Sequence, residues 1–368
     1  MARARSVRNE VSERLASIGK VAKRFEAWRP GTEVLTKVTA QKTIFPGINR
    51  ATRVGGWPNQ RIALIHGPSS HGKTSLVHGI GLSYLLGGHF YLFVDAEYTS
   101  PEDWLRKLML GQVDNPGFLA LRPKSYEQTR EAVSNAAKMI VEAKKSGELP
   151  ADVACFVAVD SIRKLMPENL FAKLAKDEGG LDGANGRGAM MKAALNAQWM
   201  DELTPLAAHC NLSIAIIARE MEKAASQPWE DDFKVAGGKA LEFESSLICR
   251  VVRSGYVYKG ADKARVVVGE RHAVRITKTK VAAKDGKLTE TFFHTSNGVL
   301  VPEGFDRARD LVELGKELGI IEVSGSWLSY SGERIGNGDH AAVERLASDT
   351  ALFAELESKM IVGEGEVV

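Results

Sequence analysis

The stretch Arg61-Ile-Ala-Leu-Ile-His-Gly-Pro-Ser-Ser-His-Gly-Lys-Thr74 decides the fold class of this chain. The apolar residues near its start are typical of a buried strand. Gly67–Thr74 then fits the phosphate-loop pattern G-x-x-x-x-G-K-[ST], and a helical pattern continues from Thr74 to residue 86. A strand, a glycine-containing loop and a helix in this order predict an α/β protein with a nucleotide site at the end of the strand.

The residues of this loop are suited to the phosphates of ATP. Glycines allow backbone N–H groups to converge on phosphate oxygens, beside a helix N-terminus that favours negative charge. In this pattern Lys73 reaches the β- and γ-phosphates, and the hydroxyl of Thr74 binds Mg²⁺. We therefore expect ATP and Mg²⁺ as cofactors, with ATP contacts from Gly67, Pro68, Ser69, Ser70, His71, Gly72, Lys73, Thr74 and Ser75.

A second apolar run ends in a carboxylate that suits the metal. Residues 156–159 are apolar and lead directly into Asp160. A carboxylate at the end of a neighbouring strand is expected to orient the Mg²⁺ shell together with Thr74. An aspartate at a strand end is common for other reasons, so this assignment depends on the phosphate loop.

A third apolar run, residues 91–94, is followed by two carboxylates, Asp95 and Glu97. Hydrolysis needs a group that orients water and accepts its proton. We predict that Glu97 is this general base and that Asp95 holds the local turn. Glu97 and Lys73 are the predicted catalytic residues of one subunit. The competing interpretation is that Glu97 is only a solvated charge at the end of a strand.

Short apolar runs alternate with helical stretches through the middle of the chain. The predicted strands cover residues 62–66, 90–94, 154–159, 214–218, 247–253 and 273–278. The predicted helices cover residues 74–86, 101–111, 125–146 and 188–208. This alternation predicts a mostly parallel, twisted sheet flanked by helices and joined by right-handed crossovers.

The two ends of the chain differ from this middle part. In residues 7–26 apolar residues recur every three or four positions, which predicts an amphipathic helix. Arg29-Pro-Gly31 breaks that pattern, so the helix is expected to be an arm. We therefore divide the chain into an N-terminal helix and linker (1–35), an ATPase core (36–300) and a small C-terminal α/β domain (301–368).

The composition is that of a globular protein, with 44% hydrophobic and 26% charged residues. We find neither an apolar run long enough to cross a bilayer nor a signal-peptide core, so we expect a cytoplasmic protein without membrane contact. Cys155, Cys210 and Cys249 have neither disulfide-framework nor metal-ligand spacing and are expected in the core. The net charge of +3 favours an anionic partner only slightly.

The order of several motifs resembles the bacterial RecA recombinase family over nearly the whole chain. The motifs are Gly67–Thr74, Val-Asp-Ala-Glu at 94–97, Val-Asp-Ser at 159–161, Gly-Gly-Lys-Ala-Leu-Glu-Phe at 237–243, Lys-Thr-Lys-Val-Ala-Ala at 278–283, Leu-Val-Glu-Leu-Gly at 311–315 and Ser-Trp-Leu-Ser-Tyr-Ser-Gly-Glu-Arg-Ile-Gly at 326–336. The first three fit many ATPases, whereas the last three in this order are much more specific.

The resemblance implies a RecA-type P-loop ATPase core and a DNA-dependent ATP hydrolase. Such a protein forms a helical homo-oligomeric filament on single-stranded DNA and pairs it with homologous double-stranded DNA in recombination and repair. The N-terminal arm would then pack on a neighbouring protomer, because head-to-tail contacts that do not close generate filaments.

The resemblance also implies roles for four site residues. Lys278 and Lys280 match a lysine pair that reaches the γ-phosphate from the adjacent subunit, where positive charge stabilises the transition state. Trp104 lies where the family places an aromatic ring against adenine. Arg219 aligns with a glutamine that senses the γ-phosphate, so we expect it to contact ATP, but it cannot act as a neutral amide switch. By themselves, the lysines are ordinary strand charges and Trp104 is an ordinary packing residue.

In the family, DNA contacts two loops of the core, which correspond to residues 167–187 and 220–238 here. The candidate contacts are phosphate-binding cations, glycines with available N–H groups, and side chains that stack on bases or insert between them. They are Arg187, Met190, Lys192, Trp229, Gly237, Gly238 and Lys239. The first loop is several residues longer than the usual form, and the acidic C-terminal tail is short.

Two other functions compete with that of a recombinase. A RecA-fold ring helicase or motor would share the ATPase motifs, but the N-terminal arm and the motifs at 311–336 argue against it. A nucleotide-gated DNA-binding protein with little turnover is consistent with Arg219, whereas Lys73, Glu97 and Asp160 argue against it.

Overall fold

The structure of the protein is a computed structural model that describes residue 18 and residues 38–168, 181–222, 233–260, 265–282 and 289–362. The chain divides into two compact units, Met1–Val38 and Thr39–Val368. The predicted arm helix at 7–26 lies outside the described residues, apart from residue 18, and Trp229 lies outside them too. The architecture below is that of the second unit.

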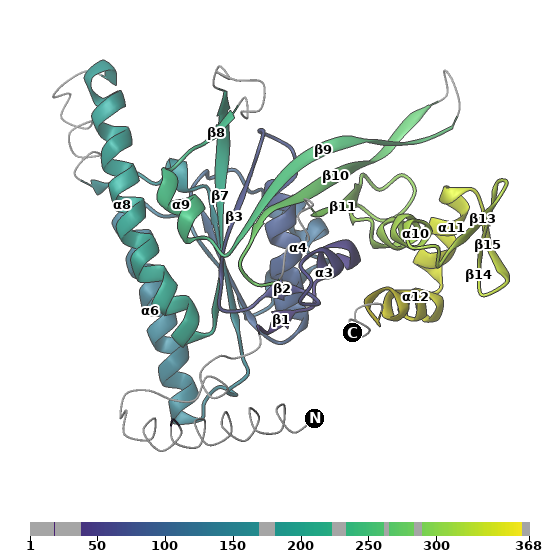
Figure 1. Cartoon of the computed structure of the whole chain (residues 1–368), viewed down its shortest axis with the longest axis horizontal. Coiled ribbons are helices and arrows are strands. Elements are labelled where there is room, and N and C mark those ends of the chain that lie inside the picture. The colour runs from purple at the N-terminus through teal and green to yellow at the C-terminus, as the bar shows by residue number, and fades with distance from the viewer. Residues whose placement is uncertain are drawn as a thin grey trace, which may run out of the picture. The chain divides into compact units, whose positions relative to one another are not determined.

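A large mixed sheet forms the centre of this unit, and its middle strands are parallel (Figure 1). Its strand order is β12-β11-β10-β9-β3-β7-β6-β4-β5, with β8 paired to β7. The strands are β3 (Ile62–Gly67), β4 (Phe90–Asp95), β5 (Phe118–Leu121), β6 (Cys155–Asp160), β7 (Leu212–Glu222), β8 (Phe233–Val235), β9 (Leu247–Lys259), β10 (Val266–Thr279), β11 (Thr289–Ser296) and β12 (Gly304–Phe305). The predicted α/β fold with a mostly parallel core sheet is confirmed.

Helices cover both faces of the sheet, as Figure 1 shows for α6 and α8 on one side and α3 and α4 on the other. Successive residues of β3 alternate between the two layers: Ala63 and Ile65 pack with α4, and Ile62 and Leu64 pack with α6 and α8. The helices are α3 (Pro46–Ala51), α4 (Lys73–Leu86), α5 (Glu102–Leu108), α6 (Tyr126–Ser146), α8 (Leu181–Cys210) and α9 (Lys239–Glu244), with short 3₁₀ turns at Gln112–Asp114 and Ile162–Lys164. None of the helices in the described ranges is long and apolar enough to span a membrane.

The structure corrects the expected bounds of both DNA loops. α8 begins at Leu181, so the predicted loop 167–187 ends too late and the backbone at Arg187 is helical. Glycines in this stretch suggested a loop, but each costs a helix only about 1 kcal/mol, which a long packed helix can offset. The second loop, predicted at 220–238, is also shorter than expected, because β7 continues to Glu222 and pairs there with β8.

The three cysteines are free thiols. Cys155 and Cys249 are completely buried in the two layers of the core, and Cys210 at the end of α8 is half-buried. Burial raises the pKa of the Cys249 thiol to about 12, and it also raises the pKa of the Cys155 thiol. The expectation of small core residues is confirmed for these two.

The C-terminal part of the chain has its own apolar cluster. Its elements are α10 (Arg307–Glu317), β13 (Glu322–Ser324), β14 (Trp327–Tyr330), β15 (Glu333–Asn337), α11 (Asp339–Ser348) and α12 (Thr350–Val362). β13, β14 and β15 form a small antiparallel sheet. The cluster also includes Phe292 of β11 and Val301, so apolar packing crosses the boundary that we predicted at residue 301. At the other end of the unit, β1 (Ala40–Gln41) pairs with β2 (Trp57–Pro58).

A buried charged cluster joins β11 to α10. The ring of His294 lies between two carboxylates, with Nδ1 2.8 Å from Asp310 Oδ1 and Nε2 3.1 Å from Glu313 Oε1. Arg271 of β10 donates to Glu313 on the same side. Burial by itself would lower the pKa of His294, but the hydrogen bonds and charges of Asp310 and Glu313 raise it to about 8.

We predict that this cluster stabilises the fold below neutral pH more than above it. A histidine whose pKa is about 6.5 when unfolded and about 8 when folded stabilises the folded state fully below pH 6.5, and the effect is lost as pH rises through 8. The loss should be about 2 kcal/mol. Urea unfolding between pH 6 and pH 9 measures it.

Two histidine-to-glutamine variants, one as the test and one as the control, check that prediction. His294→Gln should remove most of the pH dependence between pH 6.5 and 8, because the titrating group is gone. His209→Gln, on an exposed position of α8, should keep it. An identical pH dependence in wild type and His294→Gln would contradict the assignment.

Candidate nucleotide site and nucleic-acid interface

The phosphate loop connects the end of β3 to the start of α4, and two of its glycines are required by their surroundings. Gly67 has φ +153° and Gly72 has φ +94°. A Cβ on Gly67 would lie 2.1 Å from the carbonyl oxygen of Val251, and a Cβ on Gly72 would lie 2.5 Å from Nδ1 of His272. The loop therefore packs against β9 and β10 too closely for any side chain at these positions.

The loop and the first turn of α4 suit a polyphosphate. Lys73 is buried, and its Nζ donates to the carbonyl oxygens of Gly67 (3.0 Å) and Pro68 (2.6 Å), so the ammonium lies inside the loop. Burial lowers the pKa of Lys73. α4 begins without a side-chain cap and without an acidic residue in its first turn, which leaves the positive end of the helix to an anion.

Thr74 and Asp160 meet at the position expected for a metal ion. Thr74 Oγ1 donates to Asp160 Oδ2 over 2.6 Å, and burial raises the pKa of Asp160 to about 6. A hydroxyl and a carboxylate are hard oxygen ligands of the kind Mg²⁺ prefers. Within the described ranges, His, Cys, Asp and Glu nowhere form a group of three that could hold a metal, so Mg²⁺ here would take its remaining ligands from phosphate and water.

Glu97 lies just beyond β4, and both of its carboxylate oxygens have partners. Ser161 Oγ donates to Oε1 over 2.6 Å, and Arg219 Nη2 donates to Oε2 over 2.7 Å. Burial would raise the pKa of Glu97, but the hydrogen bonds from Ser161 and Arg219 lower it below its ordinary value. Arg219, which the sequence analysis expected to contact ATP, therefore helps to keep the candidate base Glu97 ionised.

Asp95 has the structural role that we predicted. Its carboxylate accepts hydrogen bonds from the backbone N–H groups of Thr99 and Ser100 and from Nε of Arg122. These contacts hold the turn that follows β4.

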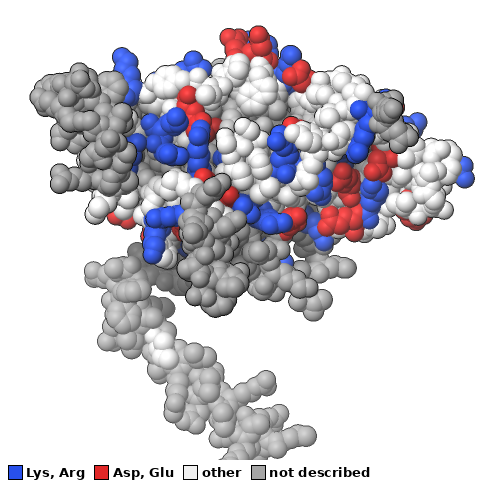
Figure 2. Space-filling view, turned by 90° about the horizontal axis from the view of Figure 1, so that it is seen from above, with Lys and Arg blue, Asp and Glu red and all other residues white. Residues whose placement is uncertain are grey.

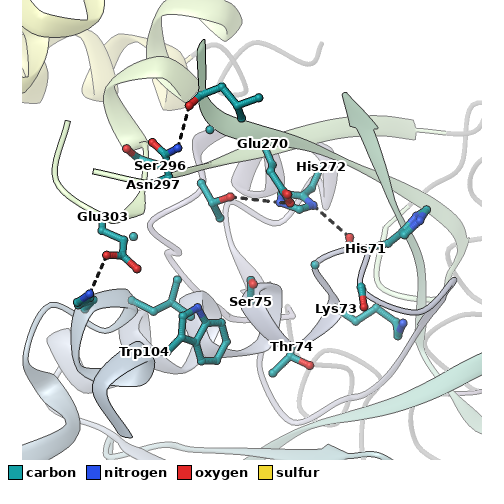
Figure 3. Close-up of a pocket in the computed structure, with 18 residues that line it drawn as sticks. His71, Lys73, Thr74, Ser75, Trp104, Glu270, His272, Ser296, Asn297 and Glu303 are labelled. Atoms are coloured by element: carbon teal, nitrogen blue, oxygen red, sulfur yellow. Dashed lines mark hydrogen bonds and ion pairs between the residues drawn. The ribbon is translucent and has the colours of Figure 1, made fainter. Parts of the chain in front are cut away.

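A pocket of about 450 Å³ opens beside the phosphate loop, as Figure 3 shows. The Trp104 ring of α5 lines it, and the same ring lies 5.8 Å from the ring of His78 in the core. Trp104 is thus both a packing residue and a wall of the pocket. An ion pair between Lys107 and Glu303, 2.9 Å apart, lies at the pocket's edge.

The opposite wall of the pocket comes from residues that the sequence analysis missed. They belong to β10, β11 and the segment after β11: Glu270, His272, Thr295, Ser296, Asn297, Glu303 and Gly304. His272 Nδ1 lies 3.1 Å from the carbonyl oxygen of His71, so this side chain contacts the phosphate loop. No motif marks these residues, because they are far from the phosphate loop in the sequence and reach it only in the folded protein, as His272 and His71 do from 201 positions apart.

Lys278 and Lys280 lie away from this pocket, at the C-terminal end of α9. Nζ of Lys278 donates to the carbonyl oxygens of Glu242 (2.5 Å) and Phe243 (2.8 Å), and Nζ of Lys280 donates to that of Phe243 (2.8 Å). Cations at a helix C-terminus are favourable for the helix dipole. Neither lysine contributes to the lining of the pocket in its own subunit.

Several candidate DNA contacts gather where α8 meets α9. Met190 is 77% exposed, so it is not a core residue. Lys192 Nζ donates to the carbonyl oxygen of Arg163, and Asn196 of α8 donates to that of Gly237. Gly237 and Gly238 have positive φ and lead into α9, which starts at the exposed Lys239.

The surface charge is mixed. On the face shown in Figure 2, Lys and Arg side chains are spread among Asp and Glu side chains. This pattern agrees with the small net charge of +3. Any nucleic-acid contact is therefore expected to depend on local groups of cations and backbone N–H donors.

Comparison with known proteins identifies the family. Residues 10–298 match the RecA N-terminal domain, and residues 309–362 match the RecA C-terminal domain. Protein RecA of Corynebacterium jeikeium is 31% identical over 314 residues, which are 85% of this chain and 74% of that protein. Protein RecA of Chloroherpeton thalassium is 28% identical over 334 residues, 90% of this chain and 83% of that protein. The chain is therefore a divergent member of the RecA family of ATP-binding and DNA-binding proteins of recombination and repair.

Proposed function

We propose that this protein is a DNA-dependent ATPase that forms a helical filament on single-stranded DNA in the cytoplasm and catalyses homologous pairing and strand exchange. The observation that carries the proposal is the arrangement of Lys73, Thr74, Asp160 and Glu97. They lie at the carboxyl ends of β3, β6 and β4, which are parallel strands of one sheet. This is the edge where ligands of open α/β sheets bind.

The chain's own residues supply the groups that ATP hydrolysis needs. When bound, MgATP would supply the phosphoryl group that is transferred to water. Lys73 would place positive charge on the phosphates, while Thr74 Oγ1 and Asp160 would hold Mg²⁺. Once freed from its present partners, the Glu97 carboxylate would orient water and accept its proton.

An exposed apolar groove supports assembly into a filament. It lies along the edge strand β5 and α6, with a volume of about 470 Å³, and is lined by Phe90, Leu92, Leu119, Met139 and Ile140. Leu119 and Met139 are more than half exposed. We propose that the apolar stripe predicted for residues 7–26 of a second copy of this chain covers the groove, since both surfaces are apolar and head-to-tail contacts between copies generate filaments.

The proposal is tested with purified protein, ATP and DNA. Single-stranded DNA should stimulate ATP hydrolysis at least several-fold, and the protein should exchange strands between homologous DNA molecules. Electron microscopy should show helical filaments, whereas closed rings would support a helicase or motor. Equal hydrolysis rates with and without DNA would reject the recombinase function.

We predict that Lys278→Ala and Lys280→Ala lower turnover only in the assembled protein. If these lysines complete the site of the adjacent subunit, their loss removes positive charge from its transition state. The measurement is the hydrolysis rate per subunit with DNA across a protein dilution series. A loss of the same size in dilute, unassembled protein would exclude a role across the interface.

The competing function is a nucleotide-gated DNA-binding protein with little turnover, and one observation favours it. Arg219 engages Glu97, the candidate base, and Ser161 engages its other oxygen. A base with both oxygens engaged is a poor proton acceptor. ATP binding and DNA binding without measurable phosphate release would support this alternative.

A further inference from the structure

The ion pair between Arg219 and Glu97 spans the strands that form the nucleotide site. Arg219 lies on β7, opposite Gly67 at the start of the phosphate loop, and Glu97 follows β4. β6, which carries Asp160, lies between β7 and β4 in the sheet. The Glu97 side chain is only 16% exposed and that of Arg219 is 33% exposed, so the pair is partly shielded from water.

The residue after Arg219, Glu220, is held by several hydrogen bonds, and these restrict movement of the backbone at Arg219. Glu220 accepts two hydrogen bonds from Arg250 of β9, over 2.7 and 3.0 Å, and one from Nδ1 of His66 over 2.9 Å. The ring of Phe233 on β8 lies 4.4 Å from the Arg250 guanidinium carbon. These contacts tie β3, β7, β8 and β9 together beside the phosphate loop.

The backbone at Arg219 is also held by pairing. Its carbonyl oxygen accepts a hydrogen bond from the N–H of Ala236, and the strand pairs with β3 on its other side. Any release of Glu97 by Arg219 is therefore a movement of the arginine side chain. A guanidinium that leaves a carboxylate needs another anion, because an unpaired, partly buried charge is costly.

We infer that Arg219 is a positioning residue that holds Glu97 in an inactive state until a phosphate anion draws the guanidinium away. The inference rests on the proposed function, because it assigns a regulator to the same hydrolytic site. A guanidinium binds phosphate and carboxylate with the same geometry, so the exchange of partners is direct. The phosphate comes from the nucleotide or from DNA, and kinetics distinguish the two sources.

The test is steady-state hydrolysis of ATP by the full chain carrying Arg219→Gln, with and without single-stranded DNA. Glutamine removes the positive charge that pairs with Glu97. We expect the rate without DNA at sub-saturating ATP to rise about 10-fold, since a charge-assisted hydrogen bond no longer holds the base. If DNA supplies the phosphate, the stimulation by DNA should fall correspondingly.

The two phosphate sources give different kinetics. If the nucleotide releases Arg219, the advantage of Arg219→Gln over wild type disappears at saturating ATP, so the effect lies in KM. If DNA releases it, the advantage remains at saturating ATP, in kcat, and disappears when single-stranded DNA is added. Either pattern supports the inference.

Three further variants make the result specific. Arg219→Lys retains a point charge and should lie between wild type and Arg219→Gln. Arg61→Gln removes a cation beside the opposite end of β3 and should leave the rate without DNA unchanged. The double variant Arg219→Gln with Glu97→Gln should be inactive, which shows that the added turnover still uses Glu97.

An unchanged or lower rate without DNA in Arg219→Gln at sub-saturating ATP, with normal ATP binding and normal thermal unfolding, would overturn the inference. If Arg219→Gln does not fold, Arg219→Lys decides by the same criterion, because it retains the charge and most of the size. The proposed function fails separately, when wild type shows no stimulation by DNA or no strand exchange. A rise in Arg219→Gln would support the positioning role even then.

Discussion

Replacing Glu97 by glutamine should lower the rate of ATP hydrolysis by about 10²- to 10⁴-fold while ATP still binds, which is the contribution expected of a general base. Glutamine has nearly the shape of glutamate, and its carbonyl oxygen can still accept the hydrogen bond from Ser161. It cannot accept a proton from water. Single-turnover hydrolysis and equilibrium binding of a fluorescent ATP analogue measure the two properties separately.

Asp95→Asn is the matched control for Glu97→Gln. Asp95 lies two residues away and holds the turn after β4 through Thr99, Ser100 and Arg122. Its neutralisation should lower the melting temperature and leave turnover at the same order of magnitude. If Glu97→Gln hydrolyses ATP at the wild-type rate, Glu97 is not the base.

Lys73→Ala should weaken nucleotide binding by at least about 100-fold, since each hydrogen bond to a charged group contributes about 1.5–3 kcal/mol. The Lys73 ammonium is the cation that lies inside the phosphate loop, where it is held by two loop carbonyl groups. Removing it leaves a concentration of phosphate charge without its nearest compensation. Isothermal titration with ATP and Mg²⁺ measures the loss.

Lys42→Ala serves as the control for Lys73→Ala. Lys42 is a half-exposed lysine whose Nζ pairs with Glu357 over 3.1 Å, outside the phosphate loop and its pocket. Its loss should leave ATP affinity unchanged. Lys73→Ala protein that is folded and binds ATP as tightly as wild type would show that the loop is not the phosphate site.

The parallel centre of the fold was predictable because its strands are buried on both faces. Ile62–Gly67 and Cys155–Asp160 are buried at every position, so they appear in the sequence as short continuous apolar runs. Thr74 and Asp160 were predictable for a related reason. Each follows such a run, and parallel strands bring their carboxyl ends to one edge of the sheet.

In the antiparallel half of the sheet, strands were predicted within β9 and β10, but β11 was missed. β11 (Thr289–Ser296) includes a buried histidine, His294, whose carboxylate partners lie on α10. β9, β10 and β11 pair as consecutive strands, so what the local sequence does not show is their packing against the phosphate loop, where His272 meets His71 from 201 positions away. The pocket wall from β10 and β11 was missed for the same reason.

The ion pair between Arg219 and Glu97 also could not be predicted from the sequence. Both residues were candidates, but their separation in the chain gives no indication that their side chains meet. The contact depends on the strand order β7-β6-β4, which places two strand ends across the one that carries Asp160. Only the assembled sheet shows that one candidate restrains the other.

The unequal burial of the three thiols has a practical consequence for studying this protein. Cys155 and Cys249 lie in the core with strongly raised pKa values, so few thiolates form there, whereas Cys210 is half-buried at the end of α8. Alkylating dyes react with the thiolate and need access to it. The natural sequence therefore offers one preferred attachment point for a fluorophore, Cys210, which lies two residues before β7, the strand that carries Arg219.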